Sequence, residues 1–219
     1  MDKRDYEAKG DYYGDEASKY DEKRFSSLKG KLYNRLQLGT LRRMLAKAPE
    51  GAYVCDVPCG TGRVGEVILE RTGKLVCGDI SDDMLGVARK KLEKYDADVT
   101  YAKIDAEHMA YPDNTFDVIT SIKLMHLLPY DIQKKCLAEF ARTTKKWVIA
   151  TYSYKGSMKW AKDYLMGKKY DSINPSSSFP RRLRELEVEM QELGLSIAER
   201  AFTFRLFSEE VIYLLEKKV

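Results

Sequence analysis

A glycine-rich stretch at residues 52–65 constrains the fold of this chain more than any other feature. A short apolar β-type run breaks at Pro58, Gly60 and Gly62, and apolar residues at helical spacing follow. Glycine is needed where the backbone takes a positive φ or where a ligand comes close, and such a turn leads the ligand to the unpaired N–H groups of a helix start. The stretch therefore predicts a strand, a tight turn and a helix, with a nucleotide-like ligand at the turn.

The acid at position 56 separates the ligands that such a turn could hold. Gly60, Gly62 and Gly65 also spell G-x-G-x-x-G, a pattern that dinucleotide-binding dehydrogenases share. The carboxylate of Asp56, four residues before the first glycine, would repel a pyrophosphate placed on the helix dipole. It suits a ligand that has no phosphate and carries a positive centre.

β-type and α-type segments alternate after this turn. We expect strands at 52–57, 74–79, 99–104, 115–121 and 146–152, and helices at 62–72, 82–95, 130–143 and 181–193. Strict alternation indicates a mostly parallel sheet with helices on both faces, which binds ligands at the carboxyl ends of its strands. Two terminal β-type runs, 195–204 and 210–215, have only a short connection and must pair antiparallel.

The glycine-rich stretch resembles motif I of the class I S-adenosylmethionine (SAM)-dependent methyltransferases, an acid followed by three alternating glycines. Asp56, Pro58, Gly60 and Gly62 occupy these positions, with proline in place of the first glycine. Over residues 50–217 the order of segments resembles the family's Rossmann-like α/β fold, a seven-stranded sheet of order 3-2-1-4-5-7-6 with a reversed last strand. The resemblance implies transfer of a methyl group from SAM to a small molecule, as in members of the ubiquinone/menaquinone-biosynthesis-like type.

The resemblance assigns cofactor contacts to acids at successive strand ends. Asp79 is expected to accept hydrogen bonds from both ribose hydroxyls; the alternative is a helix N-cap, a role that Ser81 fills better. Asp105 is expected to accept from the adenine amino group, with the N–H of Ala106 at the ring; the alternative is a simple turn. Further expected cofactor contacts are Cys59, Thr61, Ile80, Met84 and Ser121, and the alternative for the apolar ones is packing in the core.

The N-terminal region is expected to cover the site. Residues 1–50 should form an arm and helices that act as a lid, and residues 51–219 the SAM-binding domain. The first 24 residues are polar yet hold four tyrosines, so we expect an arm that orders over the site, and the alternative is a frayed terminus. Tyr20 and Arg24 resemble a segment with which small-molecule methyltransferases reach the methionine carboxylate; the alternative is a solvated charge run.

The acceptor end of the site carries weaker signals. His126, just beyond the fourth strand, could take a proton from a hydroxyl acceptor or could be structural. Residues 122–124 lack the Asn/Asp-Pro-Pro-aromatic motif of amino-group methyltransferases, which counts against nucleic-acid substrates. No carboxylates stand at Ser121 or at 151–153, so we expect no metal. The segment 153–180 is expected to be irregular and to cap the acceptor site.

Composition sets the class of protein. With 44% hydrophobic and 33% charged residues, the 219-residue chain is expected to fold as one soluble domain. The four cysteines form no C-x-x-C pair, so we expect neither disulfides nor a zinc site, as is typical of a reduced, cytoplasmic protein. No apolar run approaches the roughly 18 residues of a membrane span, and no signal peptide is expected.

Two other functions stay open at this point. A SAM-binding partner subunit without catalytic activity would be consistent with the unusual Pro58. An NAD(P)-dependent reductase could use Tyr130 and Lys134 as a Tyr-x-x-x-Lys pair, although the charge of Asp56 argues against that cofactor.

Overall fold

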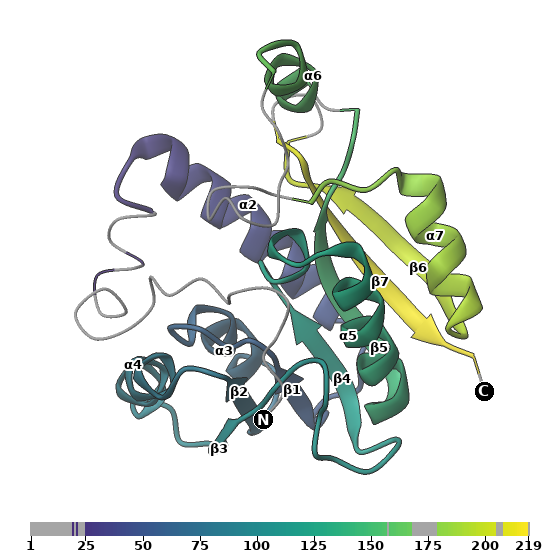
Figure 1. Cartoon of the computed structure of the whole chain (residues 1–219). Helices are drawn as coiled ribbons and strands as arrows, with labels where there is room; N and C mark the ends of the chain where they lie inside the picture. The colour runs from purple at the N-terminus through teal and green to yellow at the C-terminus, as the bar shows by residue number, and fades with distance from the viewer. Residues whose placement is uncertain are drawn as a thin grey trace.

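A seven-stranded sheet forms the centre of the computed structural model (Figure 1). The structure describes residues 19, 21, 25–156, 158–167, 179–204 and 208–218. The strands are β1 (Val54–Asp56), β2 (Lys74–Asp79), β3 (Asp98–Lys103), β4 (Phe116–Ser121), β5 (Thr144–Ser153), β6 (Leu195–Phe202) and β7 (Glu210–Lys217). Their order is β3-β2-β1-β4-β5-β7-β6, and only β7 runs antiparallel to its neighbours. The predicted fold class and strand order are therefore confirmed.

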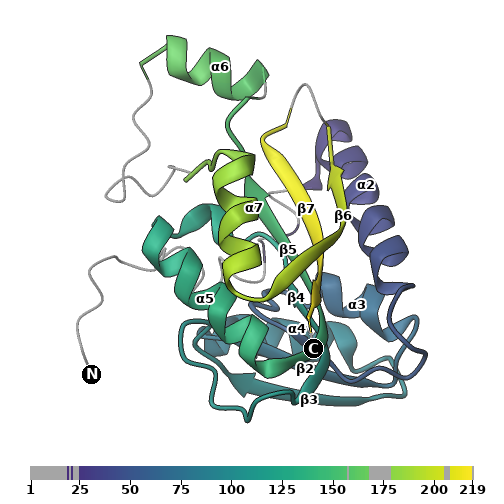
Figure 2. The same ribbon diagram turned by 90° about the vertical axis from the view of Figure 1, so that its right-hand side faces the viewer.

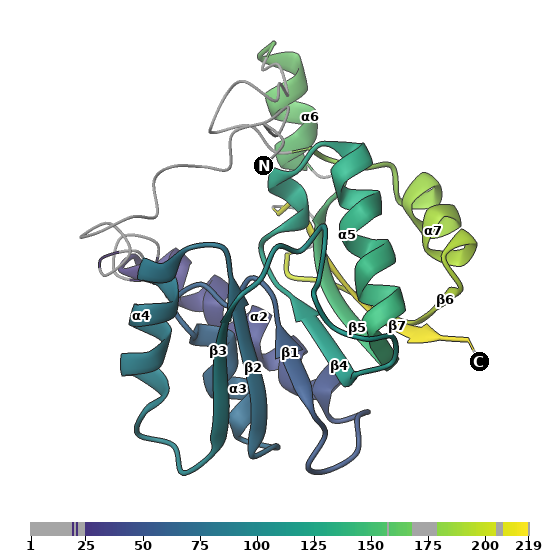
Figure 3. The ribbon, with the colours of Figure 1, turned by 60° about the horizontal axis from the view of Figure 1, so that its bottom comes forward.

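Helices cover both faces of the sheet (Figure 3). One face packs against α2 (Leu28–Leu45), α3 (Arg63–Leu69) and α4 (Asp82–Leu92), and the other against α5 (Tyr130–Thr143) and α7 (Leu183–Glu192). A short 3₁₀ helix, η1 (Met125–Leu127), follows β4. Because successive side chains of a strand point to opposite faces, β1 serves both cores, with Val54 in one cluster and Cys55 in the other.

The buried face of α2 holds only some of the leucines of this helix. Leu41 and Leu45 are buried, whereas Leu32 and Leu36 are exposed. Side chains four residues apart share a helix face, and the buried face runs from Gln37 to Leu41 and Leu45. A buried glutamine is tolerated here because its amide donates to the Glu210 carboxylate at 2.7 Å. The buried face of α2 thus carries a polar contact with the start of β7 beside its apolar side chains.

The segment after β5 contains a helix, so the prediction of an irregular 153–180 is wrong for its first half. α6 (Met158–Leu165) extends beyond the carboxyl end of β5, away from the sheet (Figure 2). Its lysines alternate with apolar residues, which hides the helical period in the sequence. The rest of the segment, 168–178, lies outside the described residues.

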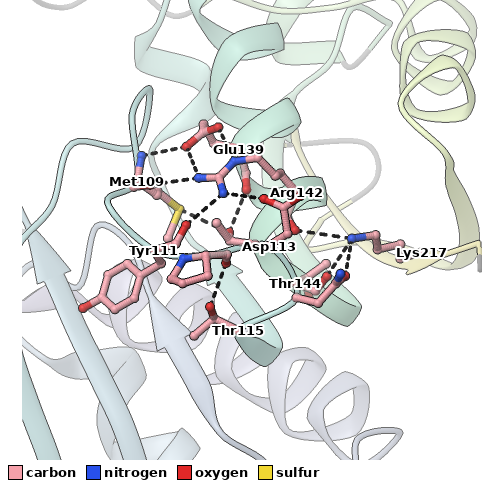
Figure 4. Close-up of polar contacts among 11 residues, drawn as sticks. Met109, Tyr111, Asp113, Thr115, Glu139, Arg142, Thr144 and Lys217 are labelled. Carbon is pink, nitrogen blue, oxygen red and sulfur yellow. Dashed lines mark hydrogen bonds and ion pairs between the residues drawn. The ribbon is translucent and has the colours of Figure 1, made fainter.

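A network around Arg142 fixes the loop between β3 and β4 (Figure 4). The guanidinium donates to the carbonyls of Met109 and Tyr111 at 2.9 and 2.8 Å and pairs with the carboxylates of Asp113 and Glu139. The hydrogen bond from Arg142 lowers the pKa of Glu139, which keeps this carboxylate charged. The network thereby anchors the chain that follows the candidate cofactor residues after β3.

Candidate functional site

The candidate site lies at the carboxyl ends of β1, β2 and β4. β1 has β2 on one side and β4 on the other, so the direction of the strand order changes here. Loops that leave such a point in opposite directions open a crevice for ligands. The strand ends bring Asp56, Asp79 and Ser121 to this edge.

The glycine loop between β1 and α3 combines tight packing with open space. Gly60 and Gly62 have φ of 51° and 78°, a region that other residues rarely adopt. A Cβ on Gly62 would lie 3.1 Å from the Cα of Ala88, so this glycine allows the loop to approach α4. Beside Gly60, by contrast, a Cβ would meet nothing within 4 Å in the described part of the chain. The loop therefore leaves room for a ligand at Gly60.

Backbone contacts hold the residues before Gly60. Pro58 stands where motif I has its first glycine, and the Val57–Pro58 peptide bond is cis. The N–H of Cys59 donates to the carbonyl of Gly78 at 2.7 Å. A hydrogen bond with Cys77, together with burial, raises the pKa of the Cys59 thiol well above its ordinary value. Cys59 thus contributes a neutral, buried side chain to the loop.

Asp79 clamps the glycine loop from the end of β2. Its two carboxylate oxygens accept from the N–H groups of Gly60 at 2.9 Å and Ser81 at 3.0 Å. Burial raises the pKa of Asp79, and these backbone hydrogen bonds oppose the shift. Ser81 itself caps α4, because its hydroxyl accepts from the N–H of Met84 at 3.3 Å. The cap therefore belongs to Ser81, and the Asp79 carboxylate, which also accepts from the N–H of Ile80, has acceptor capacity left for a further donor.

Asp56 carries a buried carboxylate that is only half satisfied. One oxygen accepts from the hydroxyl of Thr120 at 2.6 Å, and the other has no partner among the described residues. Burial raises the pKa of Asp56 to about 7; the positive charge of Arg63 works against this shift and the negative charge of Asp79 adds to it. A buried acceptor without a donor is costly and rare, so the free oxygen points to a missing partner.

A second buried polar atom without a hydrogen-bond partner among the described residues lies at the end of β4. The hydroxyl of Ser121 is fully buried and likewise lacks a hydrogen-bond partner within the described ranges. Asp56 pairs in register with Thr120, so Ser121 extends from the opposite face of the sheet. The two strands that flank the switch point thus both end in polar atoms that a ligand could satisfy.

The residues expected around the adenine lie along the ends of β2 and β3. Asp105 stands two residues beyond β3 and accepts from the N–H of Glu107 at 3.1 Å. This hydrogen bond is the one expected if Asp105 forms a simple turn, the alternative to a contact with adenine. Asp105 and Ala106 are half-buried. Ile80 is half-buried and Met84 is buried. These residues share one edge of the crevice, and the turn bond leaves acceptor capacity on the Asp105 carboxylate.

The N-terminal region reaches the glycine loop through Asp21. Its carboxylate accepts from the Thr61 hydroxyl at 2.9 Å and pairs with the ammonium of Lys91 on α4. The side chain of Thr61 is therefore directed to the arm. Tyr20 and Arg24, predicted to reach the cofactor, lie outside the described residues.

A charged cluster that sequence reasoning missed lies beyond β4. Lys123 has φ of 68°, unusual for a residue with a side chain, and its N–H donates to the Thr151 hydroxyl at 2.7 Å. Its ammonium pairs with Glu210 at the start of β7 and bonds to the hydroxyl of Tyr33 on α2. Strained backbone of this kind concentrates at functional sites.

Glu210 is the buried centre of this cluster. Burial alone would raise its pKa, but the charge of Lys123 and several hydrogen bonds lower the pKa to about 2. The amide of Gln37 and the hydroxyl of Thr203 both donate to one of its carboxylate oxygens, each at 2.7 Å. The members come from α2, β5, β7 and the segments just after β4 and β6. In the sequence, the one visible signal is the acid that opens the apolar run of β7. The cluster ties α2 to the start of β7 and to the chain after β4.

The remaining candidates take separate positions. His126 lies in η1, half-buried, and its carbonyl accepts from the N–H of Phe179 at 2.8 Å. The hydroxyl of Tyr130 donates to the carbonyl of Pro180 at 3.0 Å, while Lys134 pairs with Glu192. Tyr130 and Lys134 are therefore engaged in unrelated contacts, which removes the structural basis for a reductase pair.

The strand order with its reversed seventh strand, together with the glycine loop at the switch point, defines the class I methyltransferase fold. Residues 54–146 match a family model described as "Methyltransferase domain". The chain thus has the fold of the class I SAM-dependent methyltransferases, and the part of it from residue 54 to residue 146 matches their domain. No helix of the described residues has the length and apolar character of a membrane span, and the same residues contain no group of three potential metal-ligating side chains.

Similarity to individual proteins covers only part of their length. Over 81 residues the chain is 38% identical to a ubiquinone/menaquinone biosynthesis C-methyltransferase, UbiE, of Saccharophagus degradans, which is 35% of this chain and 32% of that protein. For the protein of the same name from Hydrogenovibrio crunogenus, the identity is 37% over 43% of this chain and 39% of the relative. The chain thus matches about a third of the length of these curated relatives.

Solved structures match over most of the chain. Magnesium protoporphyrin IX methyltransferase from Synechocystis, with bound S-adenosylhomocysteine (SAH), superposes with a TM-score of 0.74, 17% identity and 88% coverage of both chains. A putative methyltransferase in complex with the Trm112 activator of Haloferax volcanii gives 0.71, 16% identity, and coverage of 97% and 98%. At such identities these similarities establish the fold.

Proposed function

We propose that this chain binds SAM at the carboxyl edge of β1, β2 and β4 and transfers its methyl group to a small-molecule acceptor. The observation that carries the proposal is the free oxygen of Asp56, buried at the end of the strand that leads into the loop with open space at Gly60. The amino group of the methionine part is a cationic donor of the kind that this oxygen lacks. SAM has no phosphate to be repelled there, unlike a dinucleotide.

The other predicted contacts fit the rest of this cofactor. Asp79 has acceptor capacity for ribose hydroxyls while it clamps Gly60, and Asp105 with Ala106 offers an acceptor and a backbone N–H to the adenine edge. Further contacts in the proposal are Cys59, Thr61, Gly62, Ile80, Met84 and Ser121, with Tyr20 and Arg24 from the N-terminal arm. SAM would supply a methyl group on a sulfonium, and the task of the protein is to align the acceptor with it.

The acceptor pocket in this proposal lies beyond β4 and β5. Residues 1–50 and 153–180 would wall it, and the cluster of Lys123 and Glu210 would hold α2 in place beside it. The curated relatives are named as C-methyltransferases of quinone biosynthesis, which supports a small molecule in place of a nucleic acid. We also infer a cytoplasmic location, because the buried Cys55, Cys59, Cys77 and Cys136 are free thiols.

A thermal-shift titration tests cofactor choice. SAM and SAH should raise the melting temperature, since a ligand at one hundred times its Kd stabilises the folded state by about 2.7 kcal/mol. NAD should leave it unchanged. Stabilisation by NAD alone would overturn the proposal. Incubation with methyl-labelled SAM and fractionated cell metabolites then separates an enzyme from a partner subunit, which would bind SAM and label nothing.

The substitution His126→Ala should leave SAH affinity nearly unchanged. The side chain lies in η1 beyond β4, at the acceptor end of the site. Turnover should fall, by about 100-fold or more, only if the acceptor must lose a proton to His126. Calorimetric titration with SAH, followed by a methyl-transfer assay over a range of pH, measures both quantities. A large loss of SAH affinity would place His126 at the cofactor instead.

A further inference from the structure

An arginine directly follows the glycine loop. Arg63 is the first residue of α3 and comes after Gly62 in the chain. Its positive charge acts on the buried carboxylate of Asp56, because it works against the rise in pKa that burial causes. Yet the second oxygen of Asp56 accepts no hydrogen bond from any described residue. A guanidinium whose charge reaches this carboxylate thus leaves its free oxygen unpaired.

Contacts from the N-terminal part of the chain hold this guanidinium. One terminal nitrogen of Arg63 donates to the amide oxygen of Asn34 at 2.6 Å and the other to that of Gln37 at 2.9 Å. Both acceptors lie on α2. The guanidinium also lies over the ring of Phe25, 5.0 Å from its centroid. Its two terminal nitrogens are therefore directed at neutral amides and not at the carboxylate of Asp56.

Gln37 suits this position because its amide serves two charged partners. Its side chain is fully buried, its oxygen accepts from Arg63, and its nitrogen donates to the carboxylate of Glu210 at 2.7 Å. A guanidinium can only donate and a carboxylate can only accept, so the two contacts together require an amide in this orientation. Glutamate here would face a second carboxylate, and lysine would face the guanidinium. The position therefore accepts neither charge.

We propose that Asn34 and Gln37 hold Arg63 away from Asp56 and so keep the free oxygen of Asp56 open for the cofactor. Without these tethers the guanidinium would turn to the unsatisfied carboxylate, since a buried anion without a partner is costly. The cofactor would then bind only to the fraction of molecules in which the oxygen is open. This inference rests on the proposed SAM site and adds two positioning residues that act through Arg63.

A double-mutant cycle tests the role of the tethers. The untethered variant, Asn34→Leu with Gln37→Met, keeps side chains of similar size and removes both acceptors of Arg63, so SAH affinity should fall by about tenfold or more. In protein that already carries Arg63→Met, the same two changes should have almost no effect, because there is no guanidinium to hold. A general loosening of α2 would weaken binding equally in both backgrounds, and equal losses would overturn the inference.

Two further variants serve as controls. Thr203→Val removes the other donor to the same oxygen of Glu210, leaves both hydrogen bonds of Arg63 in place, and should bind SAH like the parent. Asn34→Asp keeps an acceptor for the guanidinium and should also retain the affinity of the parent. A loss with Thr203→Val as large as that of the untethered variant would assign the effect to Glu210 and overturn the role of Arg63.

The carboxylate of Asp56 gives a second readout that needs no cofactor. The other groups that face it are the hydroxyl of Thr120, the carboxylate of Asp79 and the thiols of Cys55 and Cys59. These groups are unchanged in the untethered variant, so a guanidinium that moves onto Asp56 should lower its pKa from about 7 by about 1 to 3. Carbon-13 NMR of the carboxyl group in a pH titration measures this pKa.

The two readouts separate failure of the inference from failure of the proposed function. An unchanged pKa of Asp56 in the untethered variant, when the parent binds SAH, would overturn the inference alone. A parent protein that binds no SAH would overturn the SAM site and this inference with it.

Discussion

The variant Asp56→Asn should be more stable than the parent protein at pH 8 and no more stable at pH 4. In the folded protein, burial raises the pKa of Asp56 from 3.8 to about 7. The folded state therefore holds a proton that the unfolded state releases, and the parent loses stability as the pH rises from about 4 to 7. The difference between the two pKa values sets an upper limit of about 4 kcal/mol on this loss.

Asparagine does not titrate, so the variant avoids this loss. Its carbonyl oxygen keeps the hydrogen bond from the Thr120 hydroxyl, while its buried amide group needs an acceptor and offsets part of the gain. The stability difference between variant and parent should thus grow with pH. Urea unfolding at a series of pH values measures it.

The same substitution should weaken SAH binding at pH 8 by about 10- to 150-fold. A hydrogen bond to a charged group contributes roughly 1.5 to 3 kcal/mol, and the variant has no charge to offer an amino group. A gain in stability with a loss of affinity is characteristic of a site whose strain is relieved by its ligand. Calorimetry with SAH tests this part.

Asp117→Asn is a control for which the change in stability with pH is expected to have the opposite sign. Asp117 lies on β4 near the amino edge of the sheet; despite partial burial, hydrogen bonds from Tyr53 and Lys145 lower its pKa. Its contribution to stability is present above its unfolded pKa and is lost as the pH falls. Asp117→Asn should therefore lose stability at neutral pH and keep SAH affinity. If the stability of both variants relative to the parent changed with pH in the same direction, the raised pKa assigned to Asp56 would be refuted.

Asp79→Ala should lower SAH affinity by at least about 5- to 150-fold. Loss of the carboxylate leaves ribose hydroxyls without an acceptor, a deficit of roughly 1 to 3 kcal/mol. It also frees the N–H groups of Gly60 and Ser81, so the glycine loop loses its clamp. The effect should therefore exceed that of deleting a simple ligand contact.

Asp79→Asn separates the two roles. The amide keeps one oxygen, which can hold either Gly60 or Ser81, so affinity should lie between those of the parent and of Asp79→Ala. Asp117→Ala serves as the matched control at the other edge of the sheet and should bind SAH like the parent. Calorimetric titration decides, and an affinity of Asp79→Ala equal to that of the parent would remove the ribose assignment.

The sequence by itself determined the architecture of the sheet and placed the candidate site residues at the ends of its strands. Alternating periods of two and 3.6 residues are local signals, and short connections limit how the strands can be ordered. The glycine pattern after β1 and the acids at Asp56, Asp79 and Asp105 are local as well, because each follows directly from a strand end. For these reasons the strand order and the edge that carries the candidate site could both be predicted.

Only the tertiary structure decided how these groups are paired. Whether Asp56 finds a second donor depends on which strands flank β1, and the clamp from Asp79 to Gly60 joins two loops. The ion pair of Lys123 and Glu210 joins the chain after β4 to the start of β7, which are distant in sequence and separated in the sheet only by β5. Burial and charge are properties of the assembled sheet, so the pKa values and free acceptors that define the chemistry of the site appear only once the strands are in place.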